Sequence, residues 1–429
     1  MSNPVKLLVI SNGHGEDIIA VKIINKIREI SPNISIVSLP LVGEGFVYTQ
    51  ENIPLIAPVK KMPSGGFIYM DNKQLWKDVN NGLISLTFTQ FKAVQSWAKK
   101  GGYILAVGDI LPLLFAWLSG ANYGFIGTAK SEYYLRDEEG FLPNISKIDR
   151  AAPLRDRIFG SIYYPWEKWL MKNKRCFGVF PRDSITTEAL QKNDICAYDF
   201  GNPMMDDLSI ASTYPDEIHL LKILLLPGSR LPECIDNWQL ILMAIDDIID
   251  SQSQDLIFVG AIAPSLNLSN FTEILKQKAW QEAPINKINS VNILINDRHG
   301  IVFTKRKAKL ILTQNAYAQC LNYCDLSIAM AGTATEQFVG LGKPVIAFPG
   351  NGAQYNQKFA QNQSRLLGIS LQLVNHPQQV AEKLQQLLSQ PDLWQFIAVN
   401  GKKRLGDTGA SQKIANFIIK KINPLMDNS

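Results

Sequence analysis

Short apolar runs alternate with stretches of helical periodicity along the whole chain, and this alternation constrains the fold more than any other feature. In the first half, the apolar runs Lys6–Ile10 and Ile34–Leu39 flank a helical pattern over about Glu16–Ile30. The pattern restarts in the second half, with apolar runs over Lys222–Leu226, Leu256–Gly260, Asp325–Met330 and Pro344–Phe348. Such alternation is typical of parallel sheets covered by helices. We therefore expect an α/β protein with two Rossmann-like, doubly wound parallel sheets.

The length of the chain also indicates two domains. At 429 residues it exceeds one ordinary domain, and a hydrophobic fraction of 46% is enough for two cores. Proline, serine and acidic residues cluster over Asn202–Glu217, which predicts the seam there. We expect an N-terminal domain over residues 1–207, a C-terminal domain over residues 218–408, and a helix within residues 409–429 that packs back across the seam. Ligands of such sheets bind beyond the carboxyl ends of the strands, so we expect the site in a cleft between the two domains.

Charge, cysteine content and hydropathy exclude several classes of protein. A net charge of +5 is mild and does not indicate a nucleic-acid partner. The five cysteines are scattered and odd in number, which suits a reducing cytoplasm. No signal peptide is visible, and the apolar stretch Tyr103–Gly127 is interrupted by Asp109 and Pro112, which favours strand, helix and strand over a membrane span. No pattern indicates an oligomeric state.

The first turn that carries recognisable chemistry is Pro227-Gly228-Ser229-Arg230, which follows the strand pattern that ends at Leu226. Gly228 allows the backbone to approach a ligand, and the helix that we expect to start near Pro232 offers unpaired N–H groups to an anion. The forked guanidinium of Arg230 suits a diphosphate. The alternative is a plain β-turn with a solvated arginine.

A second turn of the same kind follows the strand pattern Asp325–Met330. Gly332 and Thr333 precede a helix that we expect to open at Thr335, with Glu336 in its first turn. Small and hydroxylated residues at a helix N-terminus again suit phosphate. Glu336 either interacts favourably with the helix dipole or accepts hydrogen bonds from a ribose diol.

Amide side chains follow the strand pattern Pro344–Phe348. Gln354, Asn356 and Gln357 cluster where a helix is expected to begin. Amides donate and accept hydrogen bonds, so they suit sugar hydroxyls, although amide-rich helix starts also occur on plain surfaces.

The turn after the first strand lies in the N-terminal domain and reads Asn12-Gly13-His14-Gly15-Glu16-Asp17. His14 is a candidate general base because its unperturbed pKa of about 6.5 suits proton transfer, and Glu16 is an acid that could orient it. The alternative is a capped turn in which Glu16 or Asp17 serves the helix N-terminus. Ile18 stands where a dinucleotide fingerprint needs its third glycine, which argues against a dinucleotide. The rival base is Asp109, a lone acid after another strand.

Aromatic and basic residues alternate near residue 165. Tyr163, Trp166 and Trp169 stand beside Lys172 and Arg175, a mixture that suits a lipid headgroup interface. An ordinary amphipathic helix explains the same pattern.

Several of these blocks resemble known enzymes. LLLPGSRLPE, GNPMMDDL and AGTATEQFVGLGKPVIAFPG resemble blocks of lipid-A-disaccharide synthases, and GNGAQYNQKFAQNQ is similar to the donor-sugar segment of the peptidoglycan GlcNAc transferase. Both families are two-domain glycosyltransferases of the GT-B fold that use UDP-sugars and membrane-embedded lipid acceptors without a metal. The resemblance covers the C-terminal half well, and the N-terminal half mainly in order and spacing.

The resemblance implies an inverting transfer of a hexosyl or N-acetylhexosaminyl group from a UDP-sugar to a lipid-linked acceptor. The C-terminal domain would hold the donor, and the N-terminal domain would hold the acceptor along a loop that includes Gly13, Gly15 and Asp17. The donor residues implied are Gly228, Ser229, Arg230, Gly332 and Thr333 at the diphosphate, Glu336 at the ribose, Gln354 and Gln357 at the hexose, and Leu312 near the uracil.

The sequence departs from the lipid-A family in the acceptor domain. That family has Gly-Glu-Ala-Ser-Gly-Asp where this chain has Asn12 to Asp17, and its acidic run matches here only at Asp109. The acceptor therefore need not be an acylated glucosamine phosphate.

No Asp-x-Asp occurs in the chain, so we expect metal-independent chemistry without a cofactor. We expect a cytoplasmic protein, with peripheral attachment to the inner face of a membrane left open. Two other functions remain: a UDP-GlcNAc 2-epimerase, which would act on the donor alone, and a catalytically silent scaffold that binds a nucleotide-sugar.

Overall fold

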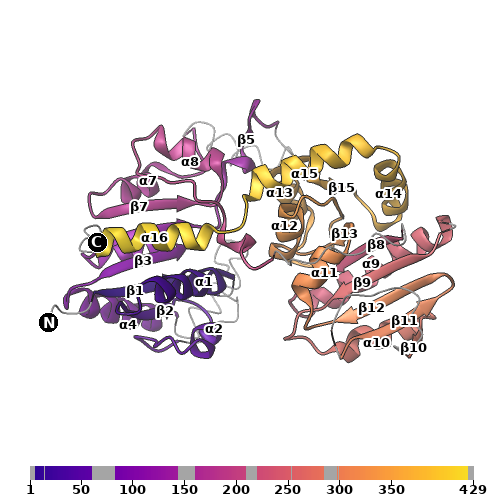
Figure 1. Ribbon diagram of the computed structural model, residues 1–429, viewed down its shortest axis with the longest axis horizontal. Coiled ribbons are helices and arrows are strands. Elements are labelled where there is room, and N and C mark those ends of the chain that lie inside the picture. The colour runs from indigo at the N-terminus through magenta and orange to yellow at the C-terminus, as the bar shows by residue number, and fades with distance from the viewer. Residues whose placement is uncertain are drawn as a thin grey trace. The chain divides into compact units, whose positions relative to one another are not determined.

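The computed structural model of the chain describes residues 5–13, 15–59, 83–143, 160–208, 220–252, 254–284, 297 and 299–423 (Figure 1). The chain divides into two compact units. The first contains residues 1–206 and 409–429, and the second contains residues 207–408.

The first unit is built on a five-stranded parallel sheet with the order β2-β1-β3-β4-β7. Its strands are almost wholly apolar and buried, as expected for a sheet that helices cover on both faces. The strands are β1 (Lys6–Ser11), β2 (Ser35–Pro40), β3 (Tyr103–Gly108), β4 (Asn122–Gly127) and β7 (Cys176–Pro181).

Right-handed crossovers determine where the helices of this unit lie. The connection from β1 to β2 runs toward one edge of the sheet through α1 (Gly15–Ile30), and the connection from β3 to β4 runs toward the other edge through α5 (Ile110–Leu118). Right-handedness therefore places α1 and α5 on opposite faces. The chain adds strands toward one edge of the sheet from β1 and toward the other edge from β3. The pair β1 and β3 is therefore the topological switch point of the sheet.

The other elements of the unit complete the two layers and the carboxyl edge. α4 (Leu83–Ala98) and α7 (Pro165–Met171) contact α5. α16 (Ala410–Ile422), yellow in Figure 1, lies against α1 among the indigo and purple elements. The remaining elements are α2 (Phe46–Gln50), η1 (Glu132–Tyr134), β5 (Arg136–Asp137), β6 (Gly140–Phe141), α8 (Ser184–Gln191) and η3 (Pro203–Met205).

The second unit has an eight-stranded sheet with the order β10-β11-β12-β9-β8-β13-β14-β15. The pairs from β12 to β15 are parallel, and β10 and β11 extend one edge in antiparallel fashion. The strands are β8 (Leu221–Leu226), β9 (Leu256–Ala261), β10 (Gln281–Ala283), β11 (Ile301–Lys305), β12 (Ala308–Thr313), β13 (Leu326–Ala329), β14 (Val345–Ala347) and β15 (Leu371–Leu373).

The switch point of the second sheet lies between β8 and β13. The chain moves to one side from β8 through α9 (Glu233–Ser251) to β9, and to the other side from β13 through α12 (Thr333–Gly340) to β14. The other helices are α10 (Leu268–Gln277), α11 (Tyr317–Tyr323), α13 (Gln357–Leu367), η5 (Gly368–Ser370), η6 (Pro377–Gln379), α14 (Val380–Leu388) and α15 (Pro391–Leu405).

The segment Tyr103–Gly127 forms a strand, a helix and a strand, as the sequence predicted. No helix in the described ranges combines the length and apolarity needed to span a bilayer. The antiparallel edge of the second sheet is a difference from the expected all-parallel arrangement.

Candidate functional site

The two glycine turns predicted to bind an anion lie side by side at the switch point of the second unit. They follow the paired strands β8 and β13, in which Leu226 lies opposite Ala329. The N–H of Met330 donates to the carbonyl of Leu226 at 2.8 Å. Gly228 has a φ of +94°, and a Cβ added to it would lie 3.3 Å from the carbonyl oxygen of Met330. Glycine is therefore favoured both by the backbone conformation and by the second turn.

Each of these turns leads into a helix without a side-chain N-cap. The residues before α9 and α12 are Pro232 and Gly332, and neither provides a side-chain hydrogen bond to the helix that follows. In α9 the N–H groups of Cys234 and Ile235 already donate to the carbonyls of Arg230 at 2.9 Å and Pro232 at 3.0 Å. The first-turn N–H groups of α12 are therefore the ones suited to an anion. Ser229 and Thr333 are exposed, and Arg230 is half-buried. The structure therefore brings the two predicted anion-binding turns together.

The predicted ribose and hexose residues lie at the same end of this sheet. Glu336 is half-buried in the first turn of α12, and Gln357 is the exposed first residue of α13. Gln354 lies in the loop between β14 and α13. Asn356 caps α13 by accepting from the N–H of Phe359 at 2.9 Å, so part of the amide cluster is structural.

Leu312 differs from the other donor residues because its side chain belongs to the core. It is 0% exposed in β12, and a Cβ on Gly260 would lie 2.6 Å from its Cδ2. Only the main chain of Leu312 could contact a base. Its neighbour Thr313 donates from Oγ1 to Asp297 at 2.5 Å.

Asp297 is a carboxylate that the sequence analysis missed. Besides Thr313, it accepts from the N–H groups of His299 at 3.0 Å and Asn315 at 3.3 Å. Its partial burial acts to raise its pKa, but the hydrogen bonds from Thr313, His299 and Asn315 outweigh burial and hold the pKa well below its ordinary value. Asp297 therefore links His299 to the carboxyl end of β12.

In the first unit, the predicted acceptor-loop residues flank the switch point between β1 and β3. Gly13 has a φ of +105°, and a Cβ on it would lie 2.4 Å from the carbonyl oxygen of Val42. Gly15 is the first residue of α1. Glu16 is half-buried and accepts from Oγ1 of Thr128, the residue after β4, at 3.4 Å. His14 lies outside the described residues.

Asp109, the rival base, follows β3 at the same edge. It is half-buried, and its Oδ1 accepts from the N–H of Leu111 at 3.0 Å, which makes it the N-cap of α5. The structure therefore gives Asp109 a structural role as a helix cap.

Asp17 does not line the acceptor loop. It is 3% exposed, and its Oδ1 accepts a hydrogen bond of 2.5 Å from Oγ of Ser11, which also lies 2.7 Å from the hydroxyl of Tyr48. Burial, followed by the Asp17 carboxylate, raises the pKa of Tyr48 well above its ordinary value. The expectation for Asp17 was wrong because this helix position faces the interior.

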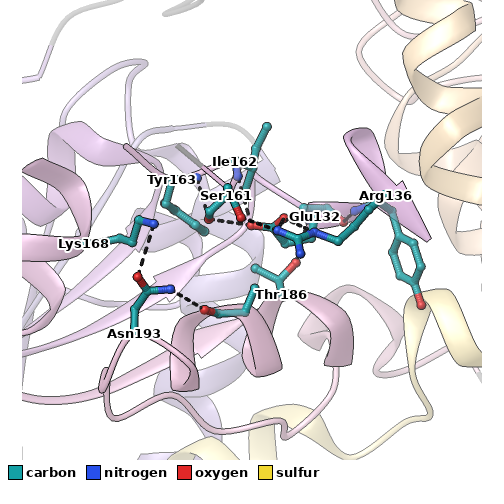
Figure 2. Close-up of polar contacts among 12 residues, drawn as sticks. Glu132, Arg136, Ser161, Ile162, Tyr163, Lys168, Thr186 and Asn193 are labelled. Carbon is teal, nitrogen blue, oxygen red and sulfur yellow. Dashed lines mark hydrogen bonds and ion pairs between the residues drawn. The ribbon is translucent and has the colours of Figure 1, made fainter. Parts of the chain in front are cut away.

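Figure 2 shows a polar network in the first unit that the sequence analysis also missed. Glu132 is fully buried after β4 and accepts from Oγ of Ser161 at 2.5 Å, the N–H of Ile162 at 2.9 Å and Nε of Arg136 at 2.8 Å. Its own N–H donates to Oγ1 of Thr186 at 2.9 Å. A buried carboxylate with several donors is a strong structural tie. Glu132 thus joins Ser161 and Ile162 to the carboxyl edge of the sheet.

The aromatic and basic segment near α7 is only partly a surface. Trp166 and Trp169 are 49% and 57% exposed, as a headgroup interface needs. Tyr163 is 3% exposed, so its inclusion was wrong. Arg175 donates to the carbonyls of Trp117 and Ala121 at the end of α5, and Lys172 forms an exposed ion pair of 2.9 Å with Asp194. These two cations already have protein partners.

The described residues contain no group of three or more histidine, cysteine, aspartate or glutamate side chains placed to hold a metal ion. Whether the chemistry is metal-independent remains a prediction.

No family model matches the chain, and no curated protein matches it significantly in sequence. S. aureus MnaA in its co-structure with UDP is 14% identical, with a TM-score of 0.56 over 98% of this chain and 97% of that one. The UDP-GlcNAc 2-epimerase from Neisseria meningitidis, bound to UDP-GlcNAc, is 15% identical, with a TM-score of 0.54 over 97% of this chain and 100% of that one. Acinetobacter baumannii MurG is 14% identical, with a TM-score of 0.54 over 97% and 100%.

At these identities the similarity establishes the fold and no more. The chain has two Rossmann-like α/β domains of the GT-B class, and the predicted fold class is confirmed.

Proposed function

We propose that this chain is an inverting glycosyltransferase that moves a hexosyl or N-acetylhexosaminyl group from a UDP-sugar to a lipid-linked acceptor. One observation carries the proposal: the turns Pro227–Arg230 and Ala331–Thr333 meet at the switch point between β8 and β13. Ligands of open α/β sheets bind at such a point. The uncapped N-terminus of α12, with the glycine turn before α9 and an arginine beside it, suits the charge of a diphosphate.

In this proposal the second unit stabilises the leaving group. Main-chain N–H groups at Gly228 and Gly332, with the Arg230 guanidinium, would neutralise the departing UDP without a metal. Glu336 would accept hydrogen bonds from the ribose, and the amides of Gln354 and Gln357 would bind the hexose. The main chain at Leu312 would lie near the uracil.

The first unit would hold the acceptor and remove the proton from its hydroxyl. His14 and Asp109 are the candidate bases, and Glu16 would orient the His14 ring. Glu16 and Asp109 lie at one edge of the sheet, after β1 and β3. Exposed Trp166 and Trp169 would let this unit rest on a membrane surface that carries the acceptor. A lipid-A-disaccharide synthase-like reaction is the specific form that the sequence blocks favour.

A second candidate is a UDP-GlcNAc 2-epimerase. The observation in its favour is the similarity in fold to the Neisseria meningitidis epimerase, which covers 97% of this chain. An epimerase would need only the UDP-sugar, whereas a transferase needs an acceptor as well.

The deciding experiment incubates the full chain with UDP-GlcNAc, with and without lipid extracted from a strain that lacks the gene. We expect UDP to be released only when lipid is present, and the variant that removes the true base, His14→Ala or Asp109→Asn, to be slower by about 10²-fold or more. A 2-epimerised sugar formed without lipid would support the epimerase instead. If neither product forms with any UDP-hexose in a panel, the result would support a catalytically silent scaffold.

A further inference from the structure

A buried carboxylate holds the loop that carries the predicted hexose-binding amides. Glu233, the first residue of α9, is only 9% exposed. Its Oε2 accepts from the N–H of Gln354 at 2.9 Å, and its Oε1 accepts from the N–H of Tyr355 at 2.5 Å. Both bonds use main-chain groups, so neither consumes the side-chain amide of Gln354.

The same loop is packed tightly on the first turns of α9. A Cβ on Gly352 would lie 2.2 Å from Cδ of Glu233, and a Cβ on Gly350 would lie 2.6 Å from Oδ1 of Asn237. Asn237 donates from Nδ2 to the carbonyl of Pro227 at 3.1 Å, in the first anion-binding turn. The loop therefore reaches α9 closely only because both positions are glycine.

A second side chain joins the loop to the other anion-binding turn. The hydroxyl of Tyr355 lies 2.8 Å from Oε1 of Gln363, and Nε2 of Gln363 donates to the carbonyls of Ala331 at 3.0 Å and Gly332 at 3.1 Å. Tyr355 and Gln363 are 2% and 3% exposed. Buried hydrogen bonds of this kind fix the relative positions of the groups they join.

We infer that Glu233 is a positioning residue that sets the Gln354–Gln357 loop relative to the two diphosphate turns, and thereby determines which donor hexose is accepted. This inference rests on the proposed UDP-sugar site. Glu233 contacts the loop, whereas the diphosphate is expected at the turns before α9 and α12. Loss of its carboxylate should therefore weaken the binding of the hexose much more than the binding of the nucleotide.

The test compares affinities for UDP and for UDP-hexoses in the full chain. Glu233→Gln keeps the shape of the side chain but replaces one acceptor oxygen by an NH₂ group that faces a main-chain N–H. Asp236→Asn is the matched control, because Asp236 is an exposed acid in the same first turn of α9. UDP, UDP-GlcNAc and UDP-glucose are titrated calorimetrically into the wild type and each variant.

We expect E233Q to bind the UDP-hexose that the wild type prefers at least about tenfold more weakly, in addition to any change in its affinity for UDP. A loss of this size is typical for removal of a hydrogen bond to a charged group. D236N should change neither affinity. Equal changes for UDP and UDP-hexose in E233Q, or none, would overturn the inference. If E233Q does not fold, Gln363→Leu, which breaks the network at its other end, must show the same separation, and equal changes there would equally overturn it.

The result also separates the inference from the proposed function. If the wild type binds no UDP, both the proposed function and the inferred role of Glu233 are wrong. A wild type that binds UDP and UDP-hexose, with an E233Q variant that behaves like D236N, removes only the role of Glu233.

Discussion

Glu16 and Asp17 are adjacent acids with different surroundings. Glu16 is half-buried near Thr128 at the edge of the sheet, whereas Asp17 is buried against Ser11. One residue along a helix rotates the side chain by about 100°, which separates a candidate ligand group from a core group. Residue type and spacing alone therefore do not distinguish the two roles at a helix start.

Asp297 yields a prediction at the scale of one residue. Because hydrogen bonds hold its folded-state pKa below the unfolded value, the carboxylate stabilises the fold above about pH 4, and this contribution is lost as the pH falls below that value. Asp297→Asn should lower the free energy of unfolding at pH 7. The deficit should shrink as the pH is lowered from 5 toward 3 in urea unfolding experiments. A deficit independent of pH would show that the ionised form has no special role.

At the scale of elements, one carboxylate anchors the C-terminal helix to the point where the chain leaves the first unit. Asp206 accepts from the N–H groups of Gly409 at 2.6 Å, Ala410 at 3.2 Å and Ser411 at 2.8 Å. A negative charge at the N-terminus of α16 also stabilises the helix through its dipole. The chain leaves the first unit after Asp206 and re-enters it at Gly409, and the Asp206 side chain joins these two points.

We predict that Asp206→Ala destabilises the first unit. Loss of an N-cap costs about 0.5–2 kcal/mol, and three bonded N–H groups place the effect in the upper part of that range. Scanning calorimetry should show a lower melting temperature for the first unit. Asp407→Ala is the control, since Asp407 is an exposed acid close to the same helix start. Equal effects of the two substitutions would contradict the capping role.

The elements that the sequence predicted well are those with long apolar runs or clear periodicity. β1, β8 and β9 were predicted to within about a residue at each end, because buried parallel strands are continuously apolar. The short antiparallel strand β10 was missed, because its three residues, Gln281–Ala283, are mostly exposed and polar. α12 begins at Thr333 rather than Thr335, a difference that capping residues alone do not reveal.

At the scale of the whole molecule, the two switch points account for what could be predicted of the site. Each predicted turn is a local strand–turn–helix motif, so its residues could be read from a short window. Glu233 and Gln363 act through contacts with residues far along the chain. Glu233 and Gln354, for example, are 121 positions apart in the sequence. No local pattern announces such contacts, and only the strand order brings them together.

We propose that the turns Pro227–Arg230 and Ala331–Thr333 bind a single diphosphate. Isothermal titration of UDP into the wild type and Arg230→Ala measures this binding. We predict one UDP bound per chain, and a loss of at least about tenfold in affinity when the guanidinium is removed. A wild type that gives no heat with UDP, or an R230A variant that binds UDP as tightly as the wild type does, would contradict the claim.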